Sequence, residues 1–210
     1  AFPLLEWSMN WCISTQAHQY LILHAAVIER DGLAAILPAP PGSGKSTLCA
    51  GLICRGWRLL SDELTLISLQ DGTIAPLCRP VSLKNESIDI IHRYEPSAVF
   101  GDVVHETTKG SVGHMKVKRH HLAHVNTVAR PAWVVFPKYA AGAAPTLTPR
   151  SRATSMLELG RNAFNYAVLG ARGFDALGDL VDRSDCYDFE YSALDDAVRV
   201  FDGLVESRRL

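Results

Sequence analysis

The chain has 210 residues, of which 48% are hydrophobic and 20% are charged, and its formal net charge is −1. This composition supplies the core of a globular domain and argues against a disordered chain, a nucleic-acid-binding protein and a protein that binds anionic membranes. No apolar run approaches the roughly 18 residues that a membrane-spanning helix needs, so we expect a cytoplasmic protein.

We expect residues 1–210 to form a single domain. The chain begins with Ala1 rather than Met, which leaves open that it is the C-terminal part of a longer polypeptide. Residues 76–150 carry ten Lys and Arg against five Asp and Glu, a net of +5, whereas residues 151–210 carry seven against eleven, a net of −4. An anionic ligand is therefore expected at the middle third of the chain.

The first third of the chain predicts a hairpin, a helix and a buried strand. Two apolar runs, 20–28 and 33–38, are separated by an Asp-Gly turn signal. The pattern becomes helical at Lys45 and stops at Gly56, where glycine is typical of a helix end. The segment 57–69 then has the apolar start and later alternation of a strand.

The middle of the chain, residues 76–130, is interrupted by Pro, Gly, His and Lys, and we expect mostly loop with short strands or turns. Periodicity returns after it. The patterns predict a buried strand, two helices, another strand and a last helix, at 131–139, 151–170, 174–181, 186–192 and 193–205, respectively.

Residues 39–47 read Ala-Pro-Pro-Gly-Ser-Gly-Lys-Ser-Thr and match the Walker A pattern G-x-x-x-x-G-K-[ST], except that Ala39 replaces its first glycine. A phosphate-binding loop needs converging backbone N–H groups, a helix N-terminus, a lysine for the terminal phosphates and a hydroxyl for Mg²⁺. The alternative is a glycine-rich turn before a helix, but the strand and helix on either side favour ATP binding. The residues expected to bind the nucleotide are Pro41, Gly42, Ser43, Gly44, Lys45, Ser46 and Thr47.

An acidic pair, Asp62 and Glu63, follows 17 residues after Lys45, counted to Asp62. P-loop enzymes need one carboxylate for Mg²⁺ or its waters and often a second one that orients or deprotonates the nucleophile. We therefore expect Ser46 and Asp62 to hold the metal. The alternative is an acidic pair that simply caps a strand in solvent.

These motifs resemble the catalytic domain of the HPr kinase/phosphorylase family, and especially the HPr-kinase-related serine kinases. The resemblance rests on His24, which lies 21 residues before Lys45, on the loop at 39–47, and on the segment Arg-Gly-Trp-Arg-Leu-Leu-Ser-Asp-Glu at 55–63. It implies an α/β P-loop fold of the HPr kinase C-terminal domain and phosphoenolpyruvate carboxykinase type. It is clearest from 20 to 68 and looser up to 170.

The resemblance also implies roles for individual residues. Glu63 takes the place of the general base, although the family pattern has Asp there. His24 is expected near the transferred phosphate, where a cationic imidazolium would offset charge or orient Glu63. The segment 78–88 falls where the family has a signature loop with a Mg²⁺-binding glutamate, and Glu86 is the nearest carboxylate. Arg152 or Arg150 matches the arginine that contacts the phosphates.

The basic middle third adds further candidates. Arg79 and Lys84 are placed to hold phosphate or substrate, or are merely solvated. The segment 104–116, which contains Lys109, is expected to be a mobile loop that closes over the site. His120 and His124 have the i, i+4 spacing of a helical metal pair, which leaves a zinc site open, but no third ligand follows at an obvious position.

The chain is therefore interpreted as an ATP- and Mg²⁺-dependent kinase that phosphorylates a hydroxyl, expected to be a serine of a small protein or peptide. Two alternatives stay open: a nucleotide-binding regulatory module that transfers nothing, and a small-molecule kinase of the carboxykinase-like group. A reverse, phosphorolytic reaction and a homo-oligomeric state are also left open. No nucleic-acid or membrane partner is expected.

Overall fold

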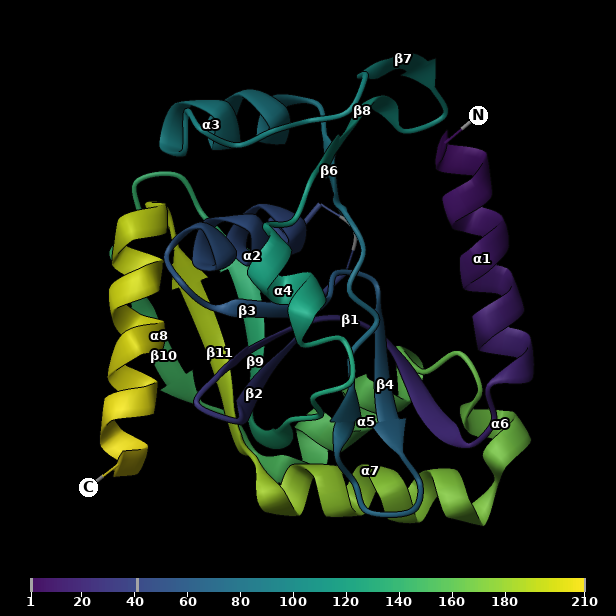
Figure 1. Cartoon of the computed structure of the whole chain (residues 1–210). Helices are drawn as coiled ribbons and strands as arrows, with labels where there is room; N and C mark the ends of the chain where they lie inside the picture. The colour runs from purple at the N-terminus through teal and green to yellow at the C-terminus, as the bar shows by residue number, and fades with distance from the viewer. Residues whose placement is uncertain (1, 41, 210) are drawn as a thin grey trace.

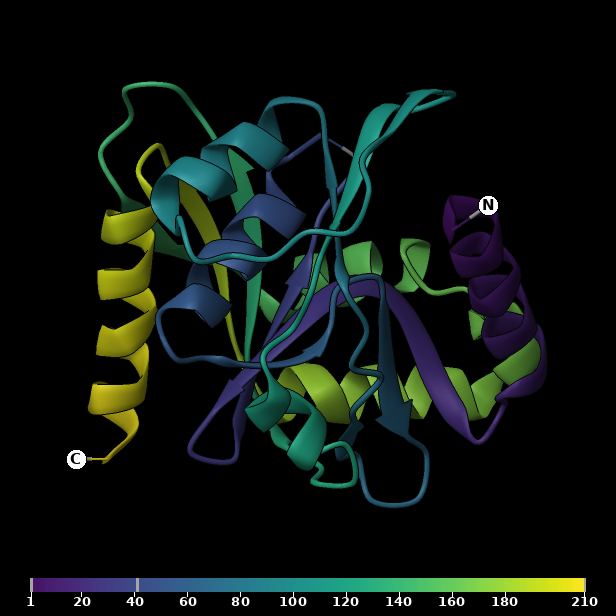
Figure 2. The ribbon, with the colours of Figure 1, turned by 45° about the horizontal axis from the view of Figure 1, so that its top comes forward.

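The computed structural model describes residues 2–40 and 42–209, and its centre is one mixed sheet between two layers of helices (Figures 1 and 2). The strands of this sheet are β1 (Tyr20–Arg30), β2 (Leu33–Pro38), β3 (Arg58–Ser61), β4 (Leu64–Ser68), β5 (Ile74–Ala75), β9 (Arg130–Tyr139), β10 (Thr146–Pro149) and β11 (Asp185–Tyr191). Their order is β10-β11-β9-β2-β1-β4-β5, and β3 pairs with β1. The α/β class expected from the sequence is confirmed.

The predicted hairpin forms β1 and β2, and the two residues between them, Asp31 and Gly32, have φ values of 56° and 78°. Positive φ at both positions is typical of the type I′ turn, whose twist matches that of the strands. Strand β2 pairs in parallel with β9, and β9 pairs in parallel with β11. The carboxyl ends of these three strands therefore lie at the same edge of the sheet.

Alternating residues of the hairpin face two separate cores. Ala26 and Ile28 of β1 belong to the core under the first helical layer, whereas Ala25 and Val27 belong to the core under the second. The first layer contains α2 (Lys45–Cys54) and α8 (Leu194–Arg209), and the second contains α5 (Arg152–Arg161), α6 (Tyr166–Leu169) and α7 (Ala171–Arg183) (Figure 1). None of the helices among the described residues is long and apolar enough to span a membrane.

The middle third is more regular than the predicted loop. It contains β6 (Val81–Lys84), α3 (Glu86–Tyr94), β7 (Val104–Thr107), β8 (Gly110–Met115) and α4 (Arg119–Ala123). The three strands form a separate sheet in the order β6-β8-β7, so the segment expected to be a mobile loop is a hairpin. The short strands fit the expectation of short strands or turns, but the helices were missed because they are short and apolar at few positions: α3 buries only Ile88 and Ile91.

Two further predictions needed correction, and one helix was missed. The segment 57–69 forms two strands with a bend at Asp62 and Glu63 rather than one strand. The helix expected over 151–170 is broken between α5 and α6, because Asn165 binds β1: its Oδ1 accepts from Ile22 N and its Nδ2 donates to Tyr20 O. Helix α1 (Phe2–Gln16), which lies beside β1 and β4 (Figure 2), was not predicted at all.

Candidate nucleotide-binding and phosphotransfer site

The Walker A segment connects the end of β2 to the start of α2, as the sequence predicts. Gly42 and Gly44 have φ values of 84° and 87°, a left-handed conformation that glycine adopts without steric cost. Helix α2 begins at Lys45, directly after Gly44, so the free N–H groups of its first turn point out of the helix at this loop. Pro41, the remaining predicted nucleotide ligand, lies outside the described residues.

The ends of two strands from the second half of the chain, β9 and β11, hold the backbone of this loop by hydrogen bonds. The Tyr139 N–H at the end of β9 donates to Ser43 O at 3.1 Å, and the Tyr191 hydroxyl at the end of β11 donates to Gly44 O at 3.2 Å. Both carbonyl groups are therefore held on the protein side of the loop. A Cβ atom at position 44 would lie 2.9 Å from Tyr191 Oη and 3.2 Å from Tyr139 Cβ, so the loop packs tightly against these strands.

Replacement of Gly44 by alanine is expected to lower the free energy of unfolding by about 1–3 kcal/mol, because a side chain at this φ is strained and meets Tyr191. Gly203→Ala in α8 is the matched control: nothing lies within 4 Å of the added Cβ, and alanine favours the helix, so stability should rise by about 0.5–1 kcal/mol. Urea unfolding of both variants measures the two values. Equal effects would show that the loop is not tightly braced.

Lys45, at the end of the loop, contacts Asp62, directly after β3. Lys45 is only 9% exposed, and its Nζ donates to the backbone oxygen of Asp62 at 3.3 Å. The Asp62 carboxylate is 7% exposed, and its Oδ2 accepts the Ser82 N–H at 3.2 Å. Burial raises the pKa of Asp62 to about 6, and the charge of Lys45 opposes this rise.

The surroundings of Asp62 fit a divalent cation. Its Oδ1 is buried and accepts no hydrogen bond from the described residues, and the Ser46 hydroxyl interacts with the same carboxyl group. A buried carboxylate oxygen without a partner is costly, and an oxygen-preferring ion such as Mg²⁺ would satisfy it. Ser46 and Asp62, which the sequence predicts as metal ligands, therefore lie together beside Lys45.

Glu63 lies next to Asp62 at the bend between β3 and β4, where α1 reaches it. Asn10 of α1 donates through Nδ2 to Glu63 Oε2, and the Asn10 Oδ1 accepts from Arg79. Arg79 is thereby linked to the predicted base through an amide, and its second terminal nitrogen is buried without a hydrogen-bond partner among the described residues. Asn10 is a site residue that the sequence patterns did not reveal.

His24 lies in β1 within the electrostatic influence of Lys45, Glu63, Lys84 and Lys109. Its ring is 5.7 Å from that of Phe164, measured between centroids. Burial is the main cause that lowers the pKa of His24 to about 4, and the three lysines act in the same direction. The imidazole is therefore neutral near pH 7 in this structure, which is a correction to the expected imidazolium.

Several of the further candidate residues lie around the same site. Lys84 ends β6, and Lys109 lies in the turn between β7 and β8, so the second sheet brings both toward His24. Glu86 is exposed at the start of α3. The residue after it, Ser87, accepts a hydrogen bond of 2.8 Å from the Thr47 hydroxyl, so the start of α3 adjoins the start of α2.

Arg150 and Arg152 are not brought to this group. Arg150 pairs with Asp188 and lies over the Phe136 ring at 4.1 Å, whereas exposed Arg152 pairs with Asp182 of α7. The charge of Arg152 acts on Cys186 at the start of β11, five residues or about 17 Å along the strand from Tyr191, which contacts the loop. Arg150 pairs three residues, or about 10 Å, from Tyr191. The phosphate-contacting role expected for either arginine has no support from this placement.

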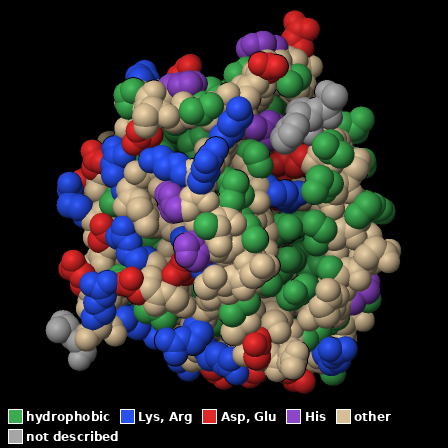
Figure 3. Space-filling model, in the orientation of Figure 1, with side chains coloured by type: hydrophobic (Ala, Val, Ile, Leu, Met, Phe, Trp, Pro, Cys, Tyr) green, Lys and Arg blue, Asp and Glu red, His purple; other side chains and the backbone are tan. Residues whose placement is uncertain are grey.

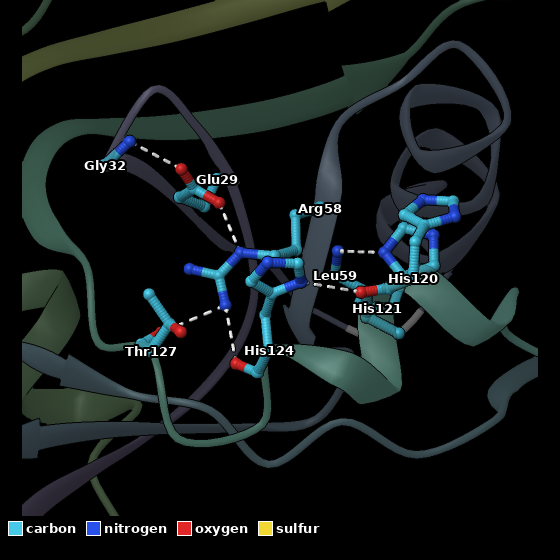
Figure 4. Close-up of polar contacts among 8 residues, drawn as sticks. All are labelled: Glu29, Gly32, Arg58, Leu59, His120, His121, His124 and Thr127. Carbon is cyan, nitrogen blue, oxygen red and sulfur yellow. Dashed lines mark hydrogen bonds and ion pairs between the residues drawn. The ribbon is translucent and has the colours of Figure 1, made fainter.

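The histidines around α4 serve packing rather than metal binding (Figure 4). Buried His121 accepts the Leu59 N–H through Nδ1, and His124 Nδ1 bonds to the His120 carbonyl. Arg58 fastens the following loop by donating to the carbonyl oxygens of His124 and Thr127. Within the described part of the chain, no three His, Cys, Asp or Glu side chains are placed to hold a metal, so zinc at His120 and His124 is not supported.

A cavity of about 370 Å³ lies between the β1–β2 turn and α8, far from the Walker A loop. Three arginines that line it are paired with acidic side chains: Arg30 with Asp202, Arg58 with Glu29, and Arg209 with Asp31. These charges satisfy one another, so the cavity lacks a free cation of the kind that a phosphate needs.

Comparison with known proteins gives two findings. A protein-family model described as "SynChlorMet cassette protein ScmC" matches residues 5–75, less than half of the chain, and this segment includes the Walker A loop and the acidic pair. Among solved structures, the HPr(Ser) kinase/phosphatase from Coxiella burnetii is similar at 12% identity and a TM-score of 0.42, over 90% of this chain and 95% of that one. A TM-score this low does not establish a shared fold. No curated protein matches the sequence.

Proposed function

We propose that the chain is an ATP-dependent phosphotransferase that transfers the γ-phosphoryl group to a hydroxyl, the acceptor being a serine of a protein or peptide. One observation carries the proposal: Lys45, Ser46, Asp62, Glu63 and His24 converge on a Walker A loop that is braced by two strands. A loop that only binds a nucleotide does not need a carboxylate such as Glu63 that can take a proton from an acceptor hydroxyl. The serine acceptor rests on the resemblance of the sequence motifs alone.

In the proposed reaction, the N–H groups of the first turn of α2 and the Lys45 ammonium bind the β- and γ-phosphates. Ser46 and Asp62 would hold Mg²⁺, which neutralises phosphate charge when bound. Glu63 accepts the proton of the acceptor hydroxyl. At the same time the hydroxyl oxygen bonds to the γ-phosphorus, and the bond from this phosphorus to the departing ADP breaks. The neutral His24 ring can donate a hydrogen bond to an oxygen in this site without supplying a charge.

Glu63→Gln is expected to reduce transfer about a hundredfold, because glutamine cannot accept the proton, while ATP binding is retained. The assay is transfer from radiolabelled ATP to proteins of an extract of the source cells, followed by identification of the labelled species. Glu106→Gln, on exposed strand β7, is a control in which one acidic charge is removed elsewhere.

Each result of this assay separates the proposal from a rival. ATP binding by the wild-type chain with no transfer to any protein, peptide or small molecule would identify a regulatory module. Label that enters only a small molecule would identify a kinase of the carboxykinase-like group. Equal transfer by Glu63→Gln and the wild type would remove Glu63 from the reaction.

A further inference from the structure

Helix α1 meets the body of the protein with a polar face. Its inward contacts toward the site are polar: Asn10 bonds to Glu63 and Arg79, and Glu6 pairs with His114 of β8 at 3.0 Å. Ile13, near its C-terminal end, packs against a small apolar cluster. Large apolar side chains of α1 instead face solvent, on the side where hydrophobic residues gather in Figure 3; they are Leu4, Leu5, Trp7, Met9 and Trp11.

This pattern shows what the inward face of α1 contributes. A helix that is held by apolar burial turns its large side chains inward, but Trp7 and Trp11 are 64% and 63% exposed. The position of Asn10 is therefore determined by the two hydrogen bonds of its amide, together with the Glu6–His114 pair and the small apolar anchor at Ile13. The amide in turn determines how Glu63 and Arg79 lie relative to each other.

The chemistry of its partners fixes the orientation of the Asn10 amide. An ionised carboxylate can only accept hydrogen bonds and a guanidinium can only donate them. The amide nitrogen must therefore face Glu63 and the amide oxygen must face Arg79. Asparagine is among the few side chains that carry a donor and an acceptor at this reach, and aspartate, leucine and alanine each lack at least the donor.

The hydrogen bond from Asn10 uses only one of the two carboxylate oxygens of Glu63. Asn10 binds Oε2, and no hydrogen bond from the described residues reaches Oε1, so this oxygen stays available to receive the proton of an acceptor hydroxyl. The same amide keeps the Arg79 guanidinium from pairing directly with Glu63, since it lies between the two groups. A direct pair would tie up the carboxylate that the reaction needs.

We infer that Asn10 is a positioning residue of this site, which holds the Glu63 carboxylate in place for the acceptor hydroxyl and separates it from Arg79. The inference rests on the proposed function, in which Glu63 is the base. Helix α1 is thereby assigned to the part of the site that would receive the acceptor hydroxyl.

The first test is kinetic and compares three variants of the full chain. Asn10→Leu keeps the volume and removes both hydrogen bonds, and Asn10→Asp keeps the acceptor for Arg79 but places a negative charge beside Glu63. We expect kcat for ATP turnover, with water or the identified serine as acceptor, to fall about tenfold in the first and further in the second, with KM for ATP unchanged. Glu6→Gln removes the negative charge from the contact between α1 and His114 of β8 and should leave kcat within twofold.

The second test needs no activity. Urea unfolding of Asn10→Leu, Arg79→Met and the double variant should give non-additive changes, because the two side chains are in direct contact. Additive changes would overturn the inference. An equal loss of kcat in Glu6→Gln would also overturn it, since docking of α1 alone would then explain the effect. Non-additive stability together with no turnover by the wild type would instead refute the proposed function and leave the contact intact.

Discussion

Lys45→Met is expected to abolish phosphoryl transfer, with a loss of about a thousandfold or more. Methionine has nearly the same length and apolar stem, so the buried position stays filled, but the cation that would face the terminal phosphates is lost. Lys45 is 9% exposed, and its Nζ has a backbone carbonyl as its hydrogen-bond acceptor, so no hydrogen bond to an acidic side chain is lost; the change does remove the charge that partly offsets the burial of Asp62. Transfer from radiolabelled ATP and calorimetric titration with ATP measure the effect.

Lys118→Met is the matched control, because this lysine is exposed before α4 and lies outside the site. Its transfer rate should equal that of the wild type. A Lys45→Met chain that still transfers at a tenth of the wild-type rate would contradict the assignment of the loop as the phosphate site. Loss in both variants would point to a general effect of lysine removal.

Asp62→Asn is expected to change function and stability in opposite directions. Without the carboxylate, Mg²⁺-dependent turnover should fall at least about a hundredfold, since metal neutralisation of the phosphates contributes several kcal/mol. In the absence of nucleotide, the same variant should be more stable than the wild type at pH 7. The reason is that the wild-type chain buries a charge there that has only partial compensation.

The sign of the stability effect follows from the pKa. Burial raises the pKa of Asp62 from 3.8 to about 6, so between these values the unfolded chain loses the proton first and the free energy of unfolding falls as the pH rises. The shift corresponds to on the order of 3 kcal/mol. The stability of Asp62→Asn relative to the wild type should therefore increase by up to about this amount from pH 4 to pH 7.

Urea unfolding at several pH values, without nucleotide or Mg²⁺, measures this difference. Asp71→Asn is the control, because Asp71 is exposed in the turn after β4 and its pKa is lowered by hydrogen bonds from Thr73. Its variant should show no gain at pH 7. A constant difference between Asp62→Asn and the wild type across the pH range would mean that Asp62 is not strained by its burial.

Elements with strong local signals could be predicted from the sequence, and elements without them could not. The hairpin at 20–38 combines two apolar runs with an Asp-Gly turn, and the strands end within two residues of the predicted bounds. Helix α3 has few apolar positions, and α1 exposes the large side chains that a periodicity argument would bury. The break after α5 depends on the two hydrogen bonds between Asn165 and β1, a contact between segments far apart in the chain.

The site shows the same division. Lys45, Ser46, Asp62 and Glu63 belong to two short motifs at a fixed spacing, so their proximity could be predicted. Asn10 reaches the site only through tertiary packing, and no local pattern marks it. Arg152 was selected from a loose match to a family motif. It lies near the start of β11, whereas the Walker A loop is contacted by the end of this strand.

The bracing of the Walker A loop has a consequence for synthesis of the protein. The loop lies in the first quarter of the chain, but the groups that hold its carbonyls, Tyr139 and Tyr191, are made much later. Strand β2, which leads into the loop, also pairs with β9, and this parallel neighbour is synthesised about 90 residues later. A ribosome that has released residues 1–75 has therefore produced Lys45, Ser46 and Asp62, and the proposed phosphate site is completed only when β11 emerges. Ribosome-bound chains should acquire nucleotide affinity in one late step, after Tyr191 has left the exit tunnel.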